Sequence, residues 1–302
     1  MSRAKLSVVI IAFNESENIA DCLQSVKWAD EIIVVDSGST DGTVEMARAA
    51  GASVISTDWP GYGVQKNRAI AYATGDWILS LDADERVTPA LRLEIESVLD
   101  HPATPVQAFE LPRLSSFCGH WMRHGGWWPD HVARLFRAGS ARFSDAIVHE
   151  HLVVEGRLGR LREPLLHYTY RTLEQALFKM DNYSTLGALK MYNAGRRTTP
   201  RKAISRGIST FFKCYFLQLG FLDGWAGLVF ANYRAQGFYY RYLKLWKLGC
   251  VSALATDSGN TRPVLPNPGP LIVRARPLAR DLRTVDQQSP HSGLAKSSDQ
   301  VV

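Results

Sequence analysis

The sequence predicts an α/β fold built around a parallel or mixed sheet, followed by a helical region. Within the first hundred residues, short apolar runs rich in β-branched residues alternate with helix-like segments of about 10 to 15 residues, a pattern typical of strands joined by helical crossovers. From Thr172 onward, apolar residues recur at three- and four-residue spacing instead. A chain of 302 residues with 46% hydrophobic content is long enough to bury one large domain plus an appendage.

The strands and helices of the first hundred residues follow from local composition. The run LSVVIIA at residues 6–12 is continuously apolar, as expected of a strand buried on both faces. Gly51 and Gly75 end two of the helix-like segments. The predicted strands are residues 6–12, 31–36, 52–57 and 76–82, and the predicted helices between them are residues 16–28, 44–51 and 64–74.

Polar clusters follow three of these strands. Asn14 and Glu15 follow the first strand, residues 36–39 (DSGS) end the second, and residues 82–85 (DADE) end the fourth. Ligands of such sheets bind beyond the carboxyl ends of the strands, so the three clusters predict one binding site.

The stretch DSGSTDGT at residues 36–43 has two readings. Asp36 followed by glycines, hydroxyls and a helix start is an arrangement that can hold the ribose or base of a nucleotide. Ser, Asp and Gly are also favoured in a plain turn with a helix cap. There is no G-x-G-x-x-G after the first strand and no G-x-x-x-x-G-K-[ST], which disfavours a dinucleotide fold and a P-loop.

Asp82 and Asp84 stand two residues apart at the end of an apolar strand. Mg²⁺ and Mn²⁺ prefer carboxylate oxygens and bind through one or two of them together with substrate phosphates, so the pair predicts half of a metal site. The alternative is a solvated loop in which Glu85 and Arg86 pair on the surface. The position at a strand end favours the metal, with Glu85 as a helper or a surface acid.

Together these motifs resemble a known family. VVIIAFNE, IIVVDSGSTDGT and QKNRAIAYATGDWILSLDADE, in this order, resemble the nucleotide-sugar domain of the inverting family 2 glycosyltransferases, over residues 5–95. GGWWPDHVARLFRAG (125–139) and FSDAIVHEHL (143–152) resemble the branch that contains bacterial lipopolysaccharide core β-1,4-glucosyltransferases. The resemblance implies a GT-A fold, which is a Rossmann-like sheet, and a nucleotide-sugar donor.

The resemblance also implies a role for each matching residue. Residues near the end of the first strand would line the nucleotide pocket, Asp36 would contact base or ribose, and two cations would meet the base or the diphosphate. Asp82 would orient ribose or sugar, and Asp84 would bind the Mg²⁺ or Mn²⁺ that bridges the diphosphate. The implied pocket residues are Ala12, Asn14 and Glu15, and the implied cations are Lys66 and Arg68.

The catalytic base is chosen among three acids. The reaction needs a carboxylate near the acceptor hydroxyl to remove its proton. The E-D pair of many family 2 enzymes is absent, which leaves Asp130, Asp145 and Glu150. Glu150 is favoured because it follows the apolar pair at residues 147–148 as if at a strand end, although a surface salt bridge is the alternative. Asp130 is the second candidate, or it fixes the acceptor loop.

Histidines and tryptophans in the middle of the chain invite further readings. Six histidines lie between residues 120 and 167, but without H-E-x-x-H or paired cysteines they do not predict zinc. His149 either orients Glu150, contacts phosphate or is structural. Trp127 and Trp128 predict either a platform for the acceptor sugar or core packing.

Charge is distributed unevenly along the chain. Residues 1–100 carry 8 Lys and Arg against 16 Asp and Glu, whereas residues 196–250 carry ten basic residues and a single acid, Asp223. Such a basic segment suits nucleic acid or an anionic membrane. Its dense aromatics favour amphipathic helices in the membrane interface, against an ordinary helical subdomain, and charged residues interrupt any clean span.

The sequence therefore divides into four parts. Residues 1–110 form the donor-binding half of the main domain, 111–170 its acceptor half, 171–250 a basic aromatic helical region and 251–302 a Ser- and Pro-rich tail with a disordered composition. Four scattered cysteines and the lack of a secretory signal favour the cytoplasm.

The predicted function is metal-dependent, inverting transfer of a hexose, expected to be glucose. The predicted donor is a UDP-hexose, and the predicted acceptor is the lipid-linked inner core of lipopolysaccharide at the inner face of the cytoplasmic membrane, without nucleic acid as a partner. Three alternatives stay open. They are a polyprenyl-phosphate glycosyltransferase, a nucleotidyltransferase, which the missing glycine-rich loop disfavours, and a non-catalytic membrane adaptor with the same fold.

Overall fold

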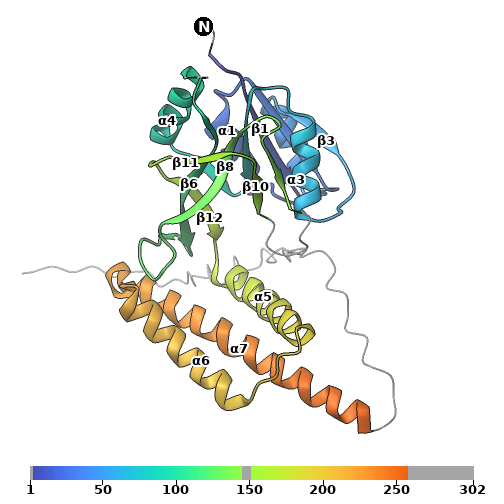
Figure 1. Ribbon diagram of the computed structural model, residues 1–302, viewed down its shortest axis with the longest axis vertical. Helices are drawn as coiled ribbons and strands as arrows, with labels where there is room; N and C mark the ends of the chain where they lie inside the picture. Colours follow the sequence, from blue (N-terminus) through green and yellow to red (C-terminus); the bar gives the residue numbers. More distant parts are fainter. Residues whose placement is uncertain (1–2, 102, 145–150, 258–302) are drawn as a thin grey trace, which may run out of the picture. The chain divides into compact units, whose positions relative to one another are not determined.

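The computed structural model describes residues 3–101, 103–144 and 151–257, all of which belong to one compact unit. Its sheet-forming segments come first in the chain and are followed by the long helices α5, α6 and α7 (Figure 1). The order of elements confirms the predicted α/β class with a C-terminal helical region.

The first four strands are those predicted. β1 to β4 pair in parallel in the order β3-β2-β1-β4, so their carboxyl ends share one edge of the sheet. The strands are β1 (Leu6–Ala12), β2 (Glu31–Asp36), β3 (Ser53–Ser56) and β4 (Trp77–Asp82), and the helices between them are α1 (Ile19–Val26), α2 (Thr43–Ala49) and α3 (Tyr62–Ala71).

β1 is buried on both faces, which explains its unbroken apolar sequence. Leu6, Val8 and Ile10 pack in one core cluster with α1 and with α4 (Pro89–Asp100), whereas Val9 packs in a second cluster with Ala69 of α3. Complete burial of one such side chain stabilises the fold by about 1.5–3 kcal/mol. A strand with alternating polar residues would bury polar groups on one face, so it would be unstable in this central position.

The second half of the sheet is mixed. β8 (Asp130–Arg137) pairs antiparallel with β4, and β6 (Val106–Phe117) pairs antiparallel with β8. β12 (Leu165–Tyr170) then runs parallel to β6 and antiparallel to the short β5 (Glu85–Val87). The remaining strands are β7 (His120–Trp121) and β11 (Arg157–Arg160), which pair with β6, and the two-stranded β9 (Ala141–Phe143) with β10 (Leu152–Val154).

Three long helices follow the sheet. α5 spans Leu173–Asn193 and α6 spans Pro200–Phe212, and each begins where a threonine hydroxyl, of Thr172 or Thr199, accepts a backbone N–H of the first turn. α6 continues as the π-helical turn η1 (Lys213–Leu217), then η2 (Gly220–Asp223) leads into α7 (Gly224–Asp257). α7 therefore runs past residue 250, where the composition changes.

Aromatic side chains join the helices to the sheet. Phe117 at the end of β6 lies 5.4 Å from Phe230 of α7 and 6.0 Å from Tyr170 of β12, measured between ring centroids. Met122, Ala176, Cys214 and Ala231 complete the buried part of this cluster. Edge-to-face pairs add about 0.5–1.5 kcal/mol each to the burial of the rings, so this cluster anchors α7.

Within the described residues, no single helix is long and apolar enough to cross a membrane. Pro200–Leu217 and Gly220–Val251 pass that test only as a pair, and they are bent by 72° at the break between them.

Candidate functional site

The loops after β1 and β2 are hydrogen-bonded to each other. The Asn14 backbone N–H donates to Ser39 Oγ at 2.8 Å, and Asn14 Oδ1 accepts the Thr40 backbone N–H at 2.9 Å. The Glu15 backbone N–H donates to Thr43 Oγ1 at 2.8 Å. The two polar clusters thus lie together at the carboxyl edge of the sheet, as the sequence predicts, and their binding of a ligand stays a prediction.

Asp36 builds the turn of the loop after β2. Its Oδ2 accepts the backbone N–H groups of Gly38 and Ser39, both at 2.9 Å, and its Oδ1 accepts Ser39 Oγ at 2.5 Å. Gly38 has φ of 90°, a left-handed conformation that favours glycine. Asp36 is buried and pairs in register with Ala12. The hydrogen-bonded turn that local composition predicts is therefore present. That Ala12 or Asp36 contacts a nucleotide stays a prediction.

Asp82 is held between two cations. Its Oδ1 lies 2.9 Å from Lys66 Nζ, and its Oδ2 lies 2.5 Å from the Arg134 guanidinium. Burial raises the pKa of Asp82, but Arg134 and Lys66 outweigh burial and hold the pKa well below its usual range. Both carboxylate oxygens are therefore engaged in ion pairs, and the role of Asp82 toward ribose or sugar stays a prediction.

Glu85 and Arg86 are buried, so the alternative of a solvated loop in which they pair on the surface is wrong. Glu85 Oε1 lies 2.7 Å from Arg134, and Glu85 Oε2 accepts the Asp82 backbone N–H at 3.0 Å. The Arg86 guanidinium donates to the carbonyls of Ala83, Glu85 and Asn18. The cause is that β5 joins the sheet beside β12, which a local pattern cannot reveal.

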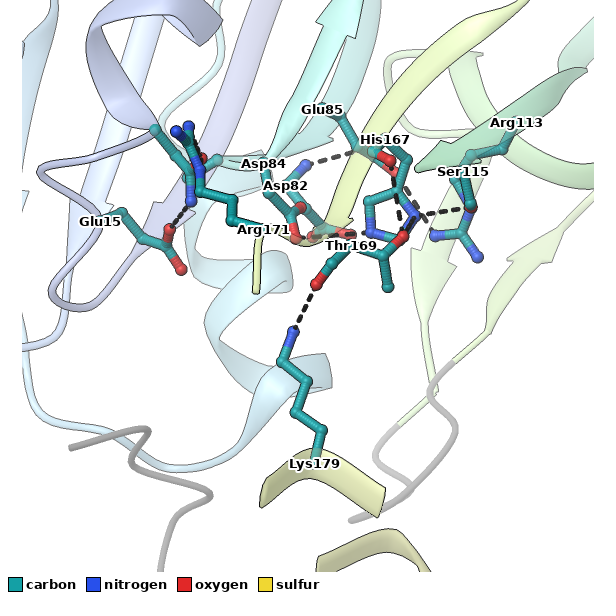
Figure 2. A network of polar contacts seen from close by, with 12 residues as sticks. Glu15, Asp82, Asp84, Glu85, Arg113, Ser115, His167, Thr169, Arg171 and Lys179 are labelled. Atoms are coloured by element: carbon teal, nitrogen blue, oxygen red, sulfur yellow. Dashed lines mark hydrogen bonds and ion pairs between the residues drawn. The ribbon is translucent and has the colours of Figure 1, made fainter. Parts of the chain in front are cut away.

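Asp84 lies beside a histidine instead of a cation. Its Oδ2 is 3.4 Å from His167 Nε2, and His167 Nδ1 lies within 3.0 Å of the hydroxyls of Ser115 and Thr169 (Figure 2). Burial raises the pKa of Asp84, but His167 more than offsets it and the pKa is lowered. The Asp84 carboxylate stays ionised next to an imidazole whose other nitrogen is held by hydroxyls, which is how protein ligands of a metal are commonly oriented.

The pair fits a divalent cation that also binds substrate. Carboxylate and imidazole suit such ions, and Mg²⁺ and Mn²⁺ usually keep positions for phosphate and water. Across the described residues, no group of three His, Cys, Asp or Glu side chains could hold a metal ion, so Asp84 and His167 are a pair of candidate ligands in this part of the chain. His167 was one of the six histidines in the sequence, but only the pairing of β12 with β5 brings it to Asp84.

The pKa of the Glu15 carboxyl group lies near neutral pH. Burial raises its pKa to about 7, although the Asn18 side-chain N–H, which donates to Glu15 Oε2 at 2.7 Å, opposes the rise. The charges of Asp84 and Asp82 raise the pKa further, and Lys179 lowers it. A cation arriving at this carboxylate cluster would favour ionised Glu15.

Lys179 reaches this site from α5. Its Nζ donates to the Thr169 carbonyl at 3.3 Å and lies 5.2 Å from the centroid of the Tyr170 ring. Figure 2 shows the side chain extending from the helix toward Thr169, next to the residues around Asp84. No sequence pattern pointed to Lys179, because it is about a hundred residues from the acidic motif and its helix has an ordinary amphipathic spacing.

The two cations predicted on α3 differ. Lys66 is almost completely buried, with Nζ 5.1 Å from the centroid of the Phe143 ring as well as against Asp82. Arg68 donates at 2.7 Å to Asp58, whose side chain is mostly exposed. The structure therefore brings Lys66 into the carboxylate cluster, whereas Arg68 pairs with the preceding loop. Neither contact tests the predicted role with the base or diphosphate.

Of the three candidate catalytic bases, Asp130 is the one that lies within the described residues. It stands at the start of β8, half-exposed, and its Oδ2 accepts from Nε and NH2 of Arg113 at 3.0 and 2.6 Å. Arg113 also approaches Glu85 at 3.4 Å, which links Asp130 to the carboxylate cluster. Asp145 and Glu150, the favoured candidate, lie outside the described residues.

Trp127 packs in the core. Its ring lies 4.4 Å from Phe230 and is stacked on Tyr170 at 6.0 Å between centroids, which supports core packing over an acceptor platform. A cavity of about 270 Å³ lies nearby, lined by Ser116, Gly119, Trp121, Tyr168, Tyr170 and Arg171. Its aromatic rings and one guanidinium suit a sugar that carries negative charge.

Comparisons with known proteins point to one family. A family model described as glycosyl transferase family 2 matches residues 7–126. The lipopolysaccharide core biosynthesis glycosyltransferase LpsC of Rhizobium meliloti is 31% identical over 78% of this chain and 93% of that protein. An uncharacterized glycosyltransferase of Rickettsia felis is 33% identical over 81% of this chain and 89% of that protein.

A solved structure is also similar in part. Glucosyl-3-phosphoglycerate synthase from Mycobacterium tuberculosis, in complex with Mn²⁺, UDP and glucosyl-3-phosphoglycerate, is 29% identical over 37% of this chain and 44% of that chain, with a TM-score of 0.32. That likeness is restricted to a minor part of each fold.

Proposed function

This chain belongs to glycosyl transferase family 2, and on that premise we propose that it is a metal-dependent, inverting hexosyltransferase of lipopolysaccharide core synthesis. The donor is a nucleoside diphosphate hexose, UDP-glucose in the first instance. The acceptor is a lipid-linked saccharide of the inner core. The name of the similar LpsC protein supports this acceptor class, and the reaction would take place at the inner face of the cytoplasmic membrane.

The Asp84–His167 pair is the observation that carries the proposal. Of the three acids in residues 82–85, Asp82 and Glu85 are neutralised by Lys66 and Arg134, so Asp84 alone faces an imidazole. Mg²⁺ or Mn²⁺ held by Asp84 and His167 would offset negative charge on the departing nucleoside diphosphate.

The neighbouring residues then have distinct tasks. The loops around Asn14 and Ser39 hold the wall against which the nucleotide binds, and their mutual hydrogen bonds fix that wall before the donor arrives. Lys179 adds a positive charge on the side of α5, where the diphosphate would lie between Asp84 and Glu15. Preorganised charges of this kind stabilise the transition state without reorganisation during the reaction.

Acceptor binding is assigned to the cavity at Trp121 and Arg171. It adjoins the metal site, because its lining residue Tyr168 follows His167 and donates its backbone N–H to the Asp84 carbonyl at 2.9 Å. Aromatic rings offer stacking faces for the sugar. A carboxylate would take the proton of the attacking hydroxyl, with Asp130, Asp145 and Glu150 as candidates and Glu150 preferred.

Donor-site chemistry is tested by Asp84→Asn. We expect kcat/KM for transfer from UDP-glucose to a core saccharide to fall about a thousandfold, because loss of the cation removes several kcal/mol of transition-state stabilisation. The stabilisation of the protein by Mn²⁺ with UDP, measured as a shift in Tm, should also disappear. Asp100→Asn, at an exposed carboxylate that ends α4, is the matched control and should change neither quantity.

Full activity of Asp84→Asn would show that the metal assignment is wrong. The base is tested separately with Glu150→Gln, Asp145→Asn and Asp130→Asn. The correct variant should lose kcat while retaining UDP-dependent stabilisation. Activity with a polyprenyl phosphate acceptor and none with core saccharides would favour the alternative acceptor. An inactive protein that binds no nucleotide sugar at all would favour the adaptor.

A further inference from the structure

Large apolar side chains are exposed along α6 and around the bend into α7. Leu217 and Trp225 are 80% and 82% exposed, which is rare for such residues in a folded protein without a partner. We call this set the α6–bend surface. It consists of Ile204, Ile208, Phe212, Phe216, Leu217, Leu219, Phe221, Leu222, Trp225 and Val229.

The exposed residues of α6 form one row. Ile204, Ile208 and Phe212 follow each other at four-residue spacing, which places them on one face of the helix. A different face of α6, at Ala203 and Gly207, packs against α7, where a Cβ added to Gly207 would lie 3.2 Å from Tyr239 Cβ. This close packing fixes the rotation of α6, so the apolar row cannot turn inward.

Basic residues accompany this surface. Lys202 and Arg206 on α6 and Lys213 at the start of η1, four and seven residues apart, form a second row on another side of the helix from the apolar row. Asp223 is the single acid in residues 196–250, and its two oxygens are taken by the His124 ring and backbone N–H at 2.7 and 2.8 Å. The outward charge of the region is therefore positive.

We propose that the α6–bend surface docks on an anionic lipid bilayer, with the apolar row and the bend in the interfacial layer and the basic residues at the lipid headgroups. Aromatic and aliphatic side chains beside Lys and Arg match that layer in both polarity and charge. A second copy of this face would bring Lys202, Arg206 and Lys213 towards the same three basic residues, which disfavours a dimer. The 72° bend between α6 and α7 favours helices that lie in the interface.

The surface is connected to the acceptor side of the candidate site. The loop after β7 donates the Gly125 N–H to the Gln218 carbonyl at 2.8 Å, and the Gly125 carbonyl accepts from Cys214 at 3.2 Å. Trp121, which lines the cavity, lies in β7 just before this loop. Docking would thus bring the cavity close to the lipid headgroups, a consequence that rests on the proposed function, whereas the docking itself does not.

Vesicle binding by the full chain tests the proposal. We expect the protein to cosediment with phosphatidylcholine vesicles that contain about 30% phosphatidylglycerol, and to bind pure phosphatidylcholine at least tenfold more weakly. Raising the salt concentration from about 0.05 to 0.5 M should weaken but not abolish binding, because salt screens charge and leaves the apolar contact intact.

Paired variants locate the surface. Leu217→Glu/Trp225→Glu should lower vesicle affinity by about tenfold or more, since two acids replace the most exposed apolar residues. Leu93→Glu on α4, also at an exposed leucine (67%), is the matched control and should bind as the wild type does. Transfer to a water-soluble acceptor should be unchanged in all variants, so a failure of docking is distinguishable from a failure of the proposed reaction.

Other results would overturn the proposal. If the double variant binds vesicles as the wild type does, the lipid contact lies elsewhere on the protein. If the wild type binds neither kind of vesicle, the proposed docking does not occur. Dimers in gel filtration that the double variant dissociates would identify a second copy as the occupant. Brominated lipids should quench the fluorescence of the wild type more than that of Trp225→Phe, and equal quenching would mean that Trp225 does not enter the interface.

Discussion

The ion-pair cluster around Asp82 and the α6–bend surface use charge in opposite ways. Around Asp82, acidic and basic side chains lie inside the protein and neutralise one another at distances near 2.5 to 2.9 Å. On α6 and the bend, exposed apolar residues lie on a segment with ten basic residues and a single acid, Asp223, which is bonded to His124. The ion pairs of the first region are satisfied within the chain. The second region is complementary to a partner outside the chain.

Arg134→Met should produce the largest effect, on stability. Removing this guanidinium deprives the carboxylates of Asp82 and Glu85 of their shared ion-pair partner. Breaking a buried ion pair in this way lowers the free energy of unfolding by about 3–5 kcal/mol. Arg68→Met, which removes a pair with the exposed Asp58, should cost under about 1 kcal/mol. Urea unfolding of both variants measures the contrast, and equal losses would contradict the internal neutralisation described for this region.

Lys179→Met should lower kcat about 10- to 100-fold if α5 supplies charge to the reaction. Lys179→Arg should recover part of the loss, because it keeps the charge. The free energy of unfolding should change by less than the transition-state loss, since Lys179 donates only to one carbonyl in the described structure. A variant with normal kcat and a lowered Tm would instead assign Lys179 to helix docking.

Glu15 should make stability depend on pH. Its pKa rises from 4.5 to about 7 on folding, so between these values the folded state holds a proton that the unfolded state has lost. Stability from this residue therefore falls as pH rises from about 4.5 to 7. Without metal, the Tm of Glu15→Gln relative to the wild type should increase over that range and then level off. A constant difference from pH 5 to 8 would refute the shift.

Trp225→Ser should have the smallest effect on folding. Its side chain is 82% exposed, so the free energy of unfolding in solution should change by less than about 0.5 kcal/mol. A much larger destabilisation in urea unfolding would mean that Trp225 belongs to the core of the helical region, and the contrast between the two regions would weaken.

The two regions also differ in how far the sequence predicts them. The strands around residues 6–12 and 31–36 were predicted closely because unbroken β-branched runs are a local signal of a doubly buried strand. The turn at Asp36 and the helix starts follow from equally local chemistry. The amphipathic spacing of α6 was visible too, but exposure of its apolar row depends on how α6 packs against α7.

Site residues that come from distant segments were not predictable. Asp84 was expected from its motif, whereas His167 and Lys179 reach it only because β12 pairs with β5 and α5 follows β12. The burial of Glu85 has the same origin, and it excludes the alternative in which Glu85 and Arg86 pair on the surface. The favoured base, Glu150, and its alternative Asp145 lie outside the described residues and stay predictions.

Internal neutralisation of Asp82 and Glu85 has a practical consequence for handling the protein. Sites whose acids repel one another without their ion commonly unfold in chelator, because metal binding and folding are then one process. Here Lys66 and Arg134 already offset that repulsion. The metal-free protein should therefore remain folded during purification with EDTA, and crystals grown without cation should accept Mn²⁺ and nucleotide by soaking.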